Sequence, residues 1–267
     1  MEFSRCEIET PELVLSYLKG PENGPPMVWL HGVSGRALRW REQLEAFSDR
    51  RQVYALDARG HGLSGRTPGH YCWLDHARDL DAFAQGVLTT PAVFVGHSLG
   101  ALQVVSLAAH RPDAVAAAVL EDPPLYSGER PDFDFTQMGM LEGAARSGMT
   151  VDQLLAVWPP IPWMGDALRR EYAEGLTQLD PENLTVSINL EATRGFDVDA
   201  CLARIRCPTL VLRAGGDGGA LRVKDLDRAL SRLARGVGAT FEKCGHQIHA
   251  EQSEQYRLTI ADFLCPD

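Results

Sequence analysis

The amino-acid sequence predicts one α/β domain, with a mostly parallel sheet of eight strands, helices on both faces and a helical insertion. The first observation is that short apolar segments alternate with segments of helical periodicity along most of the 267 residues. The second is the pattern Gly-His-Ser-Leu-Gly at residues 96–100, between an apolar run and a helical run. The third is a break in the alternation from residue 126 to 198, where no strand of the central type is evident.

The first part of the chain supplies five of the predicted strands. Residues 3–8 and 13–18 form a hairpin pattern around Thr10-Pro11-Glu12, and 27–30 is a continuous apolar run, typical of a strand covered on both faces. The next strands are predicted at 53–57 and 92–95, and the helices at 37–47, 73–87 and 101–110.

The second part adds a strand at 114–120 and then changes character. Helical segments are predicted at 137–146, 151–157 and 167–179. Alternation returns with strands at 209–213 and 239–243 and helices at 221–233 and 251–263. We therefore expect a core formed by residues 1–125 and 199–267, with residues 126–198 inserted as a helical cap.

The composition excludes several classes of partner. Hydrophobic residues make up 45% of the chain, charged residues 23%, and the formal net charge is −10, which argues against nucleic acid and anionic membrane surfaces. No apolar run approaches the roughly 18 residues of a membrane span. Six scattered cysteines without a C-x-x-C pair, and a start without signal-peptide features, favour free thiols in the cytoplasm.

Ser98 is the predicted nucleophile because of its position between strand and helix. A sharp turn there strains the serine backbone and exposes its hydroxyl, while Gly96 and Gly100 leave room where side chains would collide. The following helix N-terminus favours developing negative charge. A serine hydroxyl also needs an imidazole base, a carboxylate that orients the base, and oxyanion donors.

His246 is the preferred base among eight histidines, because it follows the last predicted strand and Gly245 allows a loop there. His249 lies about one helical turn further on and is expected to cap or support the site. The two histidines lack the spacing of H-E-x-x-H, so we predict no metal. We expect structural roles for His31 and His61, and a ring that points away from the serine for His97.

Two carboxylates remain open as the partner of His246. Asp217 lies in a glycine-rich loop after the strand at 209–213 and is preferred, while Asp122 follows the strand at 114–120 and is the alternative. Asp57 and Asp75 precede the serine and are interpreted as structural. The expected oxyanion donors are the backbone N–H groups of Leu99 and Val33.

Together these motifs resemble the α/β-hydrolase superfamily over essentially the full chain. The similarity lies in His31-Gly32, residues 57–64, residues 96–100, Asp217 and Gly245-His246, with the order Ser–Asp–His. Ala214 stands where the family often has glycine before its acid, and no proline follows, so Asp122 stays open beside Asp217. The serine argues against the dehalogenases and epoxide hydrolases of this fold, which carry aspartate there.

The resemblance implies a serine hydrolase that cleaves a small ester or lactone without a cofactor. Amide, carbamate or C–C bond hydrolysis on the same fold is the alternative, and a non-catalytic small-molecule receptor is the third hypothesis. Trp158, Ile161 and Trp163 in the predicted cap are candidates for apolar walls of the substrate site. If they form those walls, an apolar acyl or alcohol portion is favoured over a charged one.

Overall fold

A computed structural model of the chain describes residues 2–130, 134–160 and 164–265 and contains one eight-stranded sheet. The strand order is β1-β2-β4-β3-β5-β6-β7-β8; β1 pairs antiparallel with β2, β2 antiparallel with β4, and all other pairs are parallel. The strands are β1 (Ser4–Glu9), β2 (Val14–Lys19), β3 (Pro26–Leu30), β4 (Gln52–Leu56), β5 (Ala92–His97), β6 (Val115–Glu121), β7 (Thr209–Ala214) and β8 (Gly236–Phe241). The predicted sheet is confirmed.

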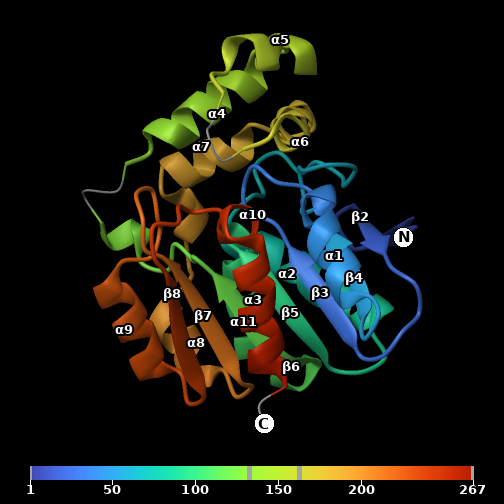
Figure 1. The fold of residues 1–267 in the computed structure, drawn as a ribbon, viewed down its shortest axis with the longest axis vertical. Helices are drawn as coiled ribbons and strands as arrows, with labels where there is room; N and C mark the ends of the chain where they lie inside the picture. The colour runs from blue at the N-terminus through green and yellow to red at the C-terminus, as the bar shows by residue number, and fades with distance from the viewer. Residues whose placement is uncertain (1, 131–133, 161–163, 266–267) are drawn as a thin grey trace.

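Helices cover both faces of this sheet (Figure 1). One face packs on α1 (Arg41–Phe47) and α11 (Ser253–Leu264), the other on α2 (Trp73–Val87), α3 (Leu99–His110), α8 (Val198–Arg204) and α9 (Val223–Arg232). The strand side chains alternate between the two cores, as the period of two requires: Val28 joins one core and Trp29 the other. This explains why the central strands read as continuous apolar runs.

The insertion between β6 and β7 is helical. Helices α4 (Thr136–Arg146), α5 (Val151–Val157), α6 (Asp166–Thr177) and α7 (Glu182–Ile188) lie beyond the carboxyl ends of the strands (Figure 1). They share a small apolar core that includes Leu154 and Leu176. Arg36 ties them to the body through Glu171 at 3.0 Å, and Tyr71 does so through Asp180 at 2.7 Å. The helices therefore cover the edge of the sheet that the carboxyl ends of its strands form.

Short elements account for most differences from the predicted boundaries. The predicted helix at 37–47 is a 3-10 turn followed by α1, and the last helix is divided at Gln252 into α10 (Ile248–Glu251) and α11. Helices α7 and α8 were not predicted from the sequence. The 3-10 turns are η1 (Ala37–Trp40), η2 (Pro112–Ala114), η3 (Ser127–Glu129) and η4 (Glu191–Thr193).

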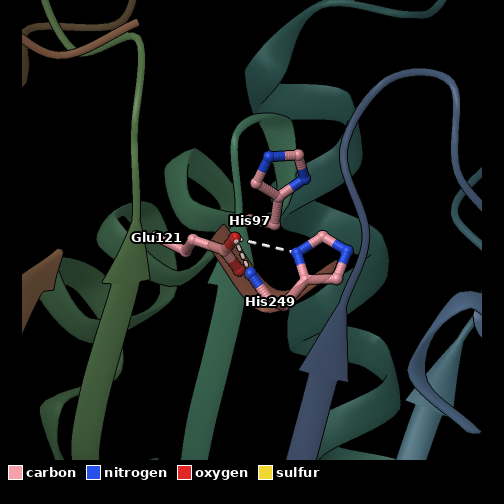
Figure 2. Close-up of side chains that lie close together, drawn as sticks. All are labelled: His97, Glu121 and His249. Carbon is pink, nitrogen blue, oxygen red and sulfur yellow. Dashed lines mark hydrogen bonds and ion pairs between the residues drawn. The ribbon is translucent and has the colours of Figure 1, made fainter. Parts of the chain in front are cut away.

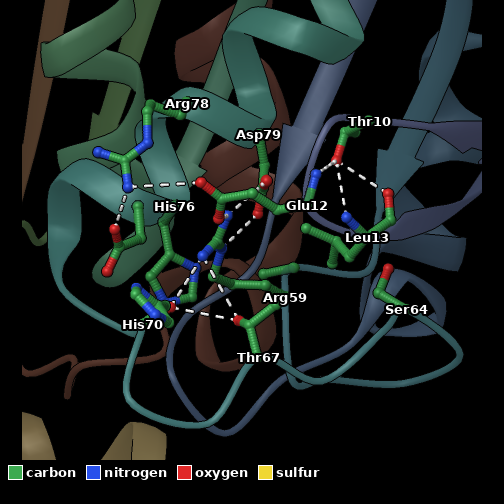
Figure 3. A network of polar contacts seen from close by, with 12 residues as sticks. Thr10, Glu12, Leu13, Arg59, Ser64, Thr67, His70, His76, Arg78 and Asp79 are labelled. Carbon is green, nitrogen blue, oxygen red and sulfur yellow. Dashed lines mark hydrogen bonds and ion pairs between the residues drawn. The ribbon is translucent and has the colours of Figure 1, made fainter.

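A buried arginine joins three segments at one side of the sheet (Figure 3). Arg59 is fully buried and bonds Asp79 through Nε at 2.6 Å and Nη2 at 2.8 Å. Its Nη2 also donates to Glu12 at 2.9 Å, and its Nη1 to the carbonyl of His70 at 2.8 Å. The residue thus links the loop after β4 to α2 and to the β1–β2 turn.

We expect Arg59→Met to lower the free energy of unfolding by about 3–5 kcal/mol, because it leaves the Asp79 carboxylate buried without a cation. Arg111→Met is the control: Arg111 is 43% exposed and pairs at 2.8 Å with Asp81, whose side chain is 34% exposed. Its loss should cost less than about 1 kcal/mol. Urea denaturation measures both variants, and equal losses would contradict the structural role given to Arg59.

Two findings concern the chain as a whole. Within the described ranges, no helix has the length and apolarity needed to cross a bilayer. All six cysteines are free, and Cys201, Cys207 and Cys244 are buried.

Candidate active site

Ser98 occupies a strained turn between β5 and α3. Its backbone angles are φ 51° and ψ −113°, a region that non-glycine residues rarely adopt. A Cβ on Gly100 would lie 2.3 Å from the carbonyl oxygen of Leu30, and one on Gly96 would lie 2.4 Å from the backbone of Gly100. The steric reason given for the two glycines is therefore confirmed.

His246 is paired with Asp122. The Nδ1 atom of His246 lies 2.7 Å from Oδ2 of Asp122, which is completely buried just beyond β6. Engagement of Nδ1 by the carboxylate leaves Nε2 as the ring nitrogen available to a group in the cavity. Ser98 and His246 line that same cavity. The structure therefore brings together a serine hydroxyl, an imidazole and a carboxylate from three distant parts of the chain.

The carboxylate that contacts His246 is not that of Asp217. Asp217 is exposed at the tip of the loop after β7, whereas the backbone of that loop encloses Asp122. The carboxylate of Asp122 accepts N–H bonds from Ala214 at 3.1 Å, Ala220 at 2.6 Å and Leu221 at 3.2 Å. The preference for Asp217 is thus corrected to the alternative, Asp122, because the glycine-rich loop supplies backbone donors and turns its own carboxylate outward.

Electrostatics distinguish His246 from the other histidines. Burial acts most strongly on its ring and lowers the pKa, but the hydrogen bond and charge of Asp122, with two nearby glutamates, outweigh it and raise the pKa above 6.5. Burial and neighbouring histidines instead hold the pKa of His97 and His31 well below that value. Near neutral pH, His97 and His31 stay uncharged, whereas His246 binds a proton more readily than an unperturbed histidine does.

His31 and His61 form structural hydrogen bonds, as expected. Nε2 of His31 accepts the N–H of Ala58 at 3.0 Å, and Nε2 of His61 lies 2.7 Å from the carbonyl oxygen of Val33. The second contact helps to set the peptide conformation of the loop after β3.

His97, Glu121 and His249 offer donor atoms within 4.8 Å of one another, a spacing that a metal ion could use (Figure 2). One ring nitrogen or carboxylate oxygen of each residue is hydrogen-bonded, whereas Oε2 of Glu121 and Nε2 of His249 are buried without a partner among the described residues. Oε1 of Glu121 accepts from the backbone N and the Nδ1 of His249, at 2.9 Å and 2.8 Å, and Nε2 of His97 donates to the carbonyl of His246 at 2.9 Å. These hydrogen bonds support the loop that carries His246.

Two cavities meet at Ser98, with volumes of about 130 Å³ and about 30 Å³. Ser98, Val33 and Met138 line both of them. The smaller cavity is mainly apolar and includes the hydroxyl groups of a few serine and threonine side chains, while the larger combines apolar cap residues with arginine, tyrosine and histidine side chains. A substrate held at Ser98 therefore has two separate directions in which its substituents can extend.

The remaining predicted residues lie at or beyond these cavities. Leu99 is the first residue of α3, so its N–H has no acceptor within the helix, and it lines the smaller cavity. Trp158 lines the larger cavity, whereas Ile161 and Trp163 lie outside the described residues. Arg39 and Tyr172 also line the larger cavity and were not anticipated, since nothing local distinguishes them from surface residues.

Comparison with known proteins agrees with this architecture. A model of the "Alpha/beta hydrolase family" matches residues 27–257. A protein of Variovorax paradoxus (strain S110), named "Putative carbamate hydrolase RutD", is 29% identical over 254 residues, which is 92% of this chain and 93% of the relative.

Solved structures show the same fold. The N-formylmaleamic acid deformylase of Pseudomonas putida S16 superposes with a TM-score of 0.84 at 21% identity, over 96% of this chain and 100% of the other. The enol-lactonase of Burkholderia xenovorans LB400 gives 0.75 at 21% identity, over 97% and 99%. With the family match across most of the sheet and the serine elbow at its centre, the chain belongs to the alpha/beta hydrolase family.

Proposed function

We propose that the chain is a serine hydrolase that cleaves a small carbonyl substrate through an acyl-enzyme, with Ser98, His246 and Asp122 as its triad. The hydrogen bond of 2.7 Å between His246 and Asp122, in a cavity shared with Ser98, carries the proposal. The burial of Asp122 and its three backbone donors keep the carboxylate in place beneath the imidazole.

In this mechanism the Ser98 hydroxyl attacks the substrate carbonyl while Nε2 of His246 takes its proton. Asp122 holds the ring by Nδ1 and stabilises the imidazolium. The N–H groups of Leu99 and Val33 are proposed to bind the oxyanion. His246 then protonates the leaving group, and a water molecule activated by the same ring releases the acid and restores Ser98.

The first candidate bond is an ester or lactone. A second candidate is a C–N bond, as in amides and carbamates, and the names of the Variovorax carbamate hydrolase and the Pseudomonas deformylase favour it. Both reactions use the same triad, because each passes through a tetrahedral intermediate with a negatively charged oxygen. They differ in the leaving group that His246 must protonate.

Matched substrates separate the two bonds. We would measure kcat/KM for an ester, a lactone, an anilide and a carbamate that share one acyl group. Turnover of the C–N substrates at rates close to those of the oxygen esters would support the second candidate, and a strong preference for esters the first. A fluorophosphonate probe should label the wild-type protein, and failure to label would favour the receptor hypothesis.

A pH profile tests the proposed role of His246. Because the base works in its neutral form and its pKa is raised above 6.5, kcat/KM should fall as the pH decreases through a midpoint above 6.5. Loss of the carboxylate in Asp122→Asn should move that midpoint to lower pH. The measurement uses a substrate without titratable groups. A wild-type midpoint below 6.5 would contradict the assignment.

We also propose that the protein works in the cytoplasm on a small molecule. The free state of all six cysteines supports a reducing compartment. Fractionation of the native cells, with an antibody against the chain, checks this location.

A further inference from the structure

The larger cavity at Ser98 is lined by cationic side chains, although the protein as a whole is acidic. The chain carries 36 acidic residues against 26 lysines and arginines, yet the described lining of this cavity includes Arg39 and Arg169 and no aspartate or glutamate. A cavity that holds cations and excludes carboxylates in an acidic protein favours a negatively charged occupant.

Arg39 is built into the wall of this cavity. Its side chain is 3% exposed, its Nε donates to Glu171 at 2.8 Å, and its guanidinium carbon lies 3.3 Å from the ring centroid of Tyr172. Its Nη2 is buried and has no hydrogen-bond partner among the described residues. Glu171 also pairs with Arg36 at 3.0 Å, so this carboxylate is shared between the two arginines. A buried charged donor without an acceptor is costly, which indicates that a ligand supplies one.

Two further residues that line the same cavity carry donors without partners. Nε1 of Trp40 and the hydroxyl of Tyr172 are buried and lack partners in the described part of the chain. Burial raises the pKa of Tyr172, so its phenol keeps the proton that it would donate. Trp40 and Arg39 belong to η1 on the body, and Tyr172 belongs to α6 in the cap. An acceptor bound by all three would therefore bridge the cap and the body.

We infer that Arg39, Tyr172 and Trp40 form a subsite for a carboxylate group of the substrate, separate from the carbonyl that Ser98 attacks. The substrate class is then a small carboxylic acid whose second acyl group is an ester or amide. The assignment rests on the proposed function for the reaction at Ser98, but not for binding of the carboxylate. It replaces the expectation of an apolar acyl or alcohol portion, because the cavity that Trp158 lines is also lined by the cationic Arg39.

Binding without turnover is the first test. Glutarate is titrated into Ser98→Ala protein by calorimetry, with dimethyl glutarate and inorganic phosphate as comparisons. Glutarate should bind, and Arg39→Met in the same background should weaken it roughly 10- to 100-fold, as expected for a lost charge-assisted hydrogen bond. Arg41→Met is the matched control, since Arg41 directly follows η1, is 57% exposed and does not line the cavity. Equal binding of dimethyl glutarate or phosphate, or equal effects of the two arginine variants, would overturn the subsite.

Kinetics supply an independent readout. The mono-4-nitrophenyl ester of adipic acid is compared with its methyl 4-nitrophenyl diester. Arg39→Met should reduce kcat/KM for the acid roughly 10- to 100-fold, mainly through KM, and leave the diester nearly unchanged. Tyr172→Phe, which removes only the hydroxyl, should also reduce kcat/KM for the acid. It replaces Arg39→Met in the test if Arg39→Met fails to fold. Equal losses on both substrates would refute the subsite, whereas glutarate binding by a protein that a fluorophosphonate cannot label would refute only the proposed function.

Discussion

Ser98→Ala is expected to lower kcat by about six orders of magnitude, the loss seen when a serine protease loses its nucleophile. The methyl group of alanine cannot form the acyl-enzyme, and no other described hydroxyl occupies the turn between β5 and α3. The substitution keeps a Cβ at the strained position, so the fold should be unaffected. Single-turnover kinetics with a chromogenic ester and mass spectrometry of the intact protein measure the acyl-enzyme directly.

Ser106→Ala is the matched control for this variant. Ser106 is buried in α3, two helical turns beyond Ser98, and does not line either cavity at the elbow. It should keep wild-type kcat and fluorophosphonate labelling. If Ser98→Ala still formed a covalent adduct, the nucleophile would be another residue.

Asp122→Asn should lower kcat by about four orders of magnitude, by analogy with the protease triad in which the same change leaves the imidazole in the wrong tautomer. The amide cannot accept the Nδ1 proton and backbone donors as the carboxylate does. The loop at 214–221 should also loosen, because Asp122 accepts three of its N–H groups. A loss of stability of about 1–3 kcal/mol is expected from those groups. Activity is therefore measured well below the melting temperature.

Asp217→Asn decides between the two carboxylates. Asp217 is exposed on the same loop, so its substitution should change kcat less than tenfold, the range of a surface residue that supports a loop. A loss of four orders for Asp217→Asn, with an active Asp122→Asn, would reverse the assignment. Thermal melts of both variants separate loosened structure from lost chemistry.

The prediction of the fold rested on signals that act over a few residues. The apolar runs at 27–30 and 92–95 lie in strands buried on both faces. Gly96 and Gly100 are needed because a side chain at either position would collide with the backbone of the turn at Ser98 or of the strand beside it. Strand β8 was less well placed, because Gly236 and Gly238 lack side chains that would reveal an edge strand. Its true start is set by pairing with Thr209 of β7.

The carboxylate that contacts His246 could not be predicted from local sequence signals. Asp122 and Asp217 both follow parallel strands, and nothing within a few residues of either says which carboxylate lies beneath the imidazole. The outcome depends on the path of the loop after β7, which folds its backbone N–H groups around Asp122. The role of Arg39 could not be predicted locally either. Its unpartnered Nη2 is buried in the folded protein, where its guanidinium carbon lies 3.3 Å from the ring centroid of Tyr172 in α6.

The amino-acid sequence alone predicted the sheet, the serine at its elbow and the histidine that follows the last strand, because periodicity, chain direction and backbone sterics are properties of short segments. Only the tertiary structure decided which carboxylate meets that histidine and what kind of cavity adjoins the serine. Such contacts join residues that are 124 and 133 positions apart, as His246 to Asp122 and Arg39 to Tyr172 are, and they arise from packing of whole elements.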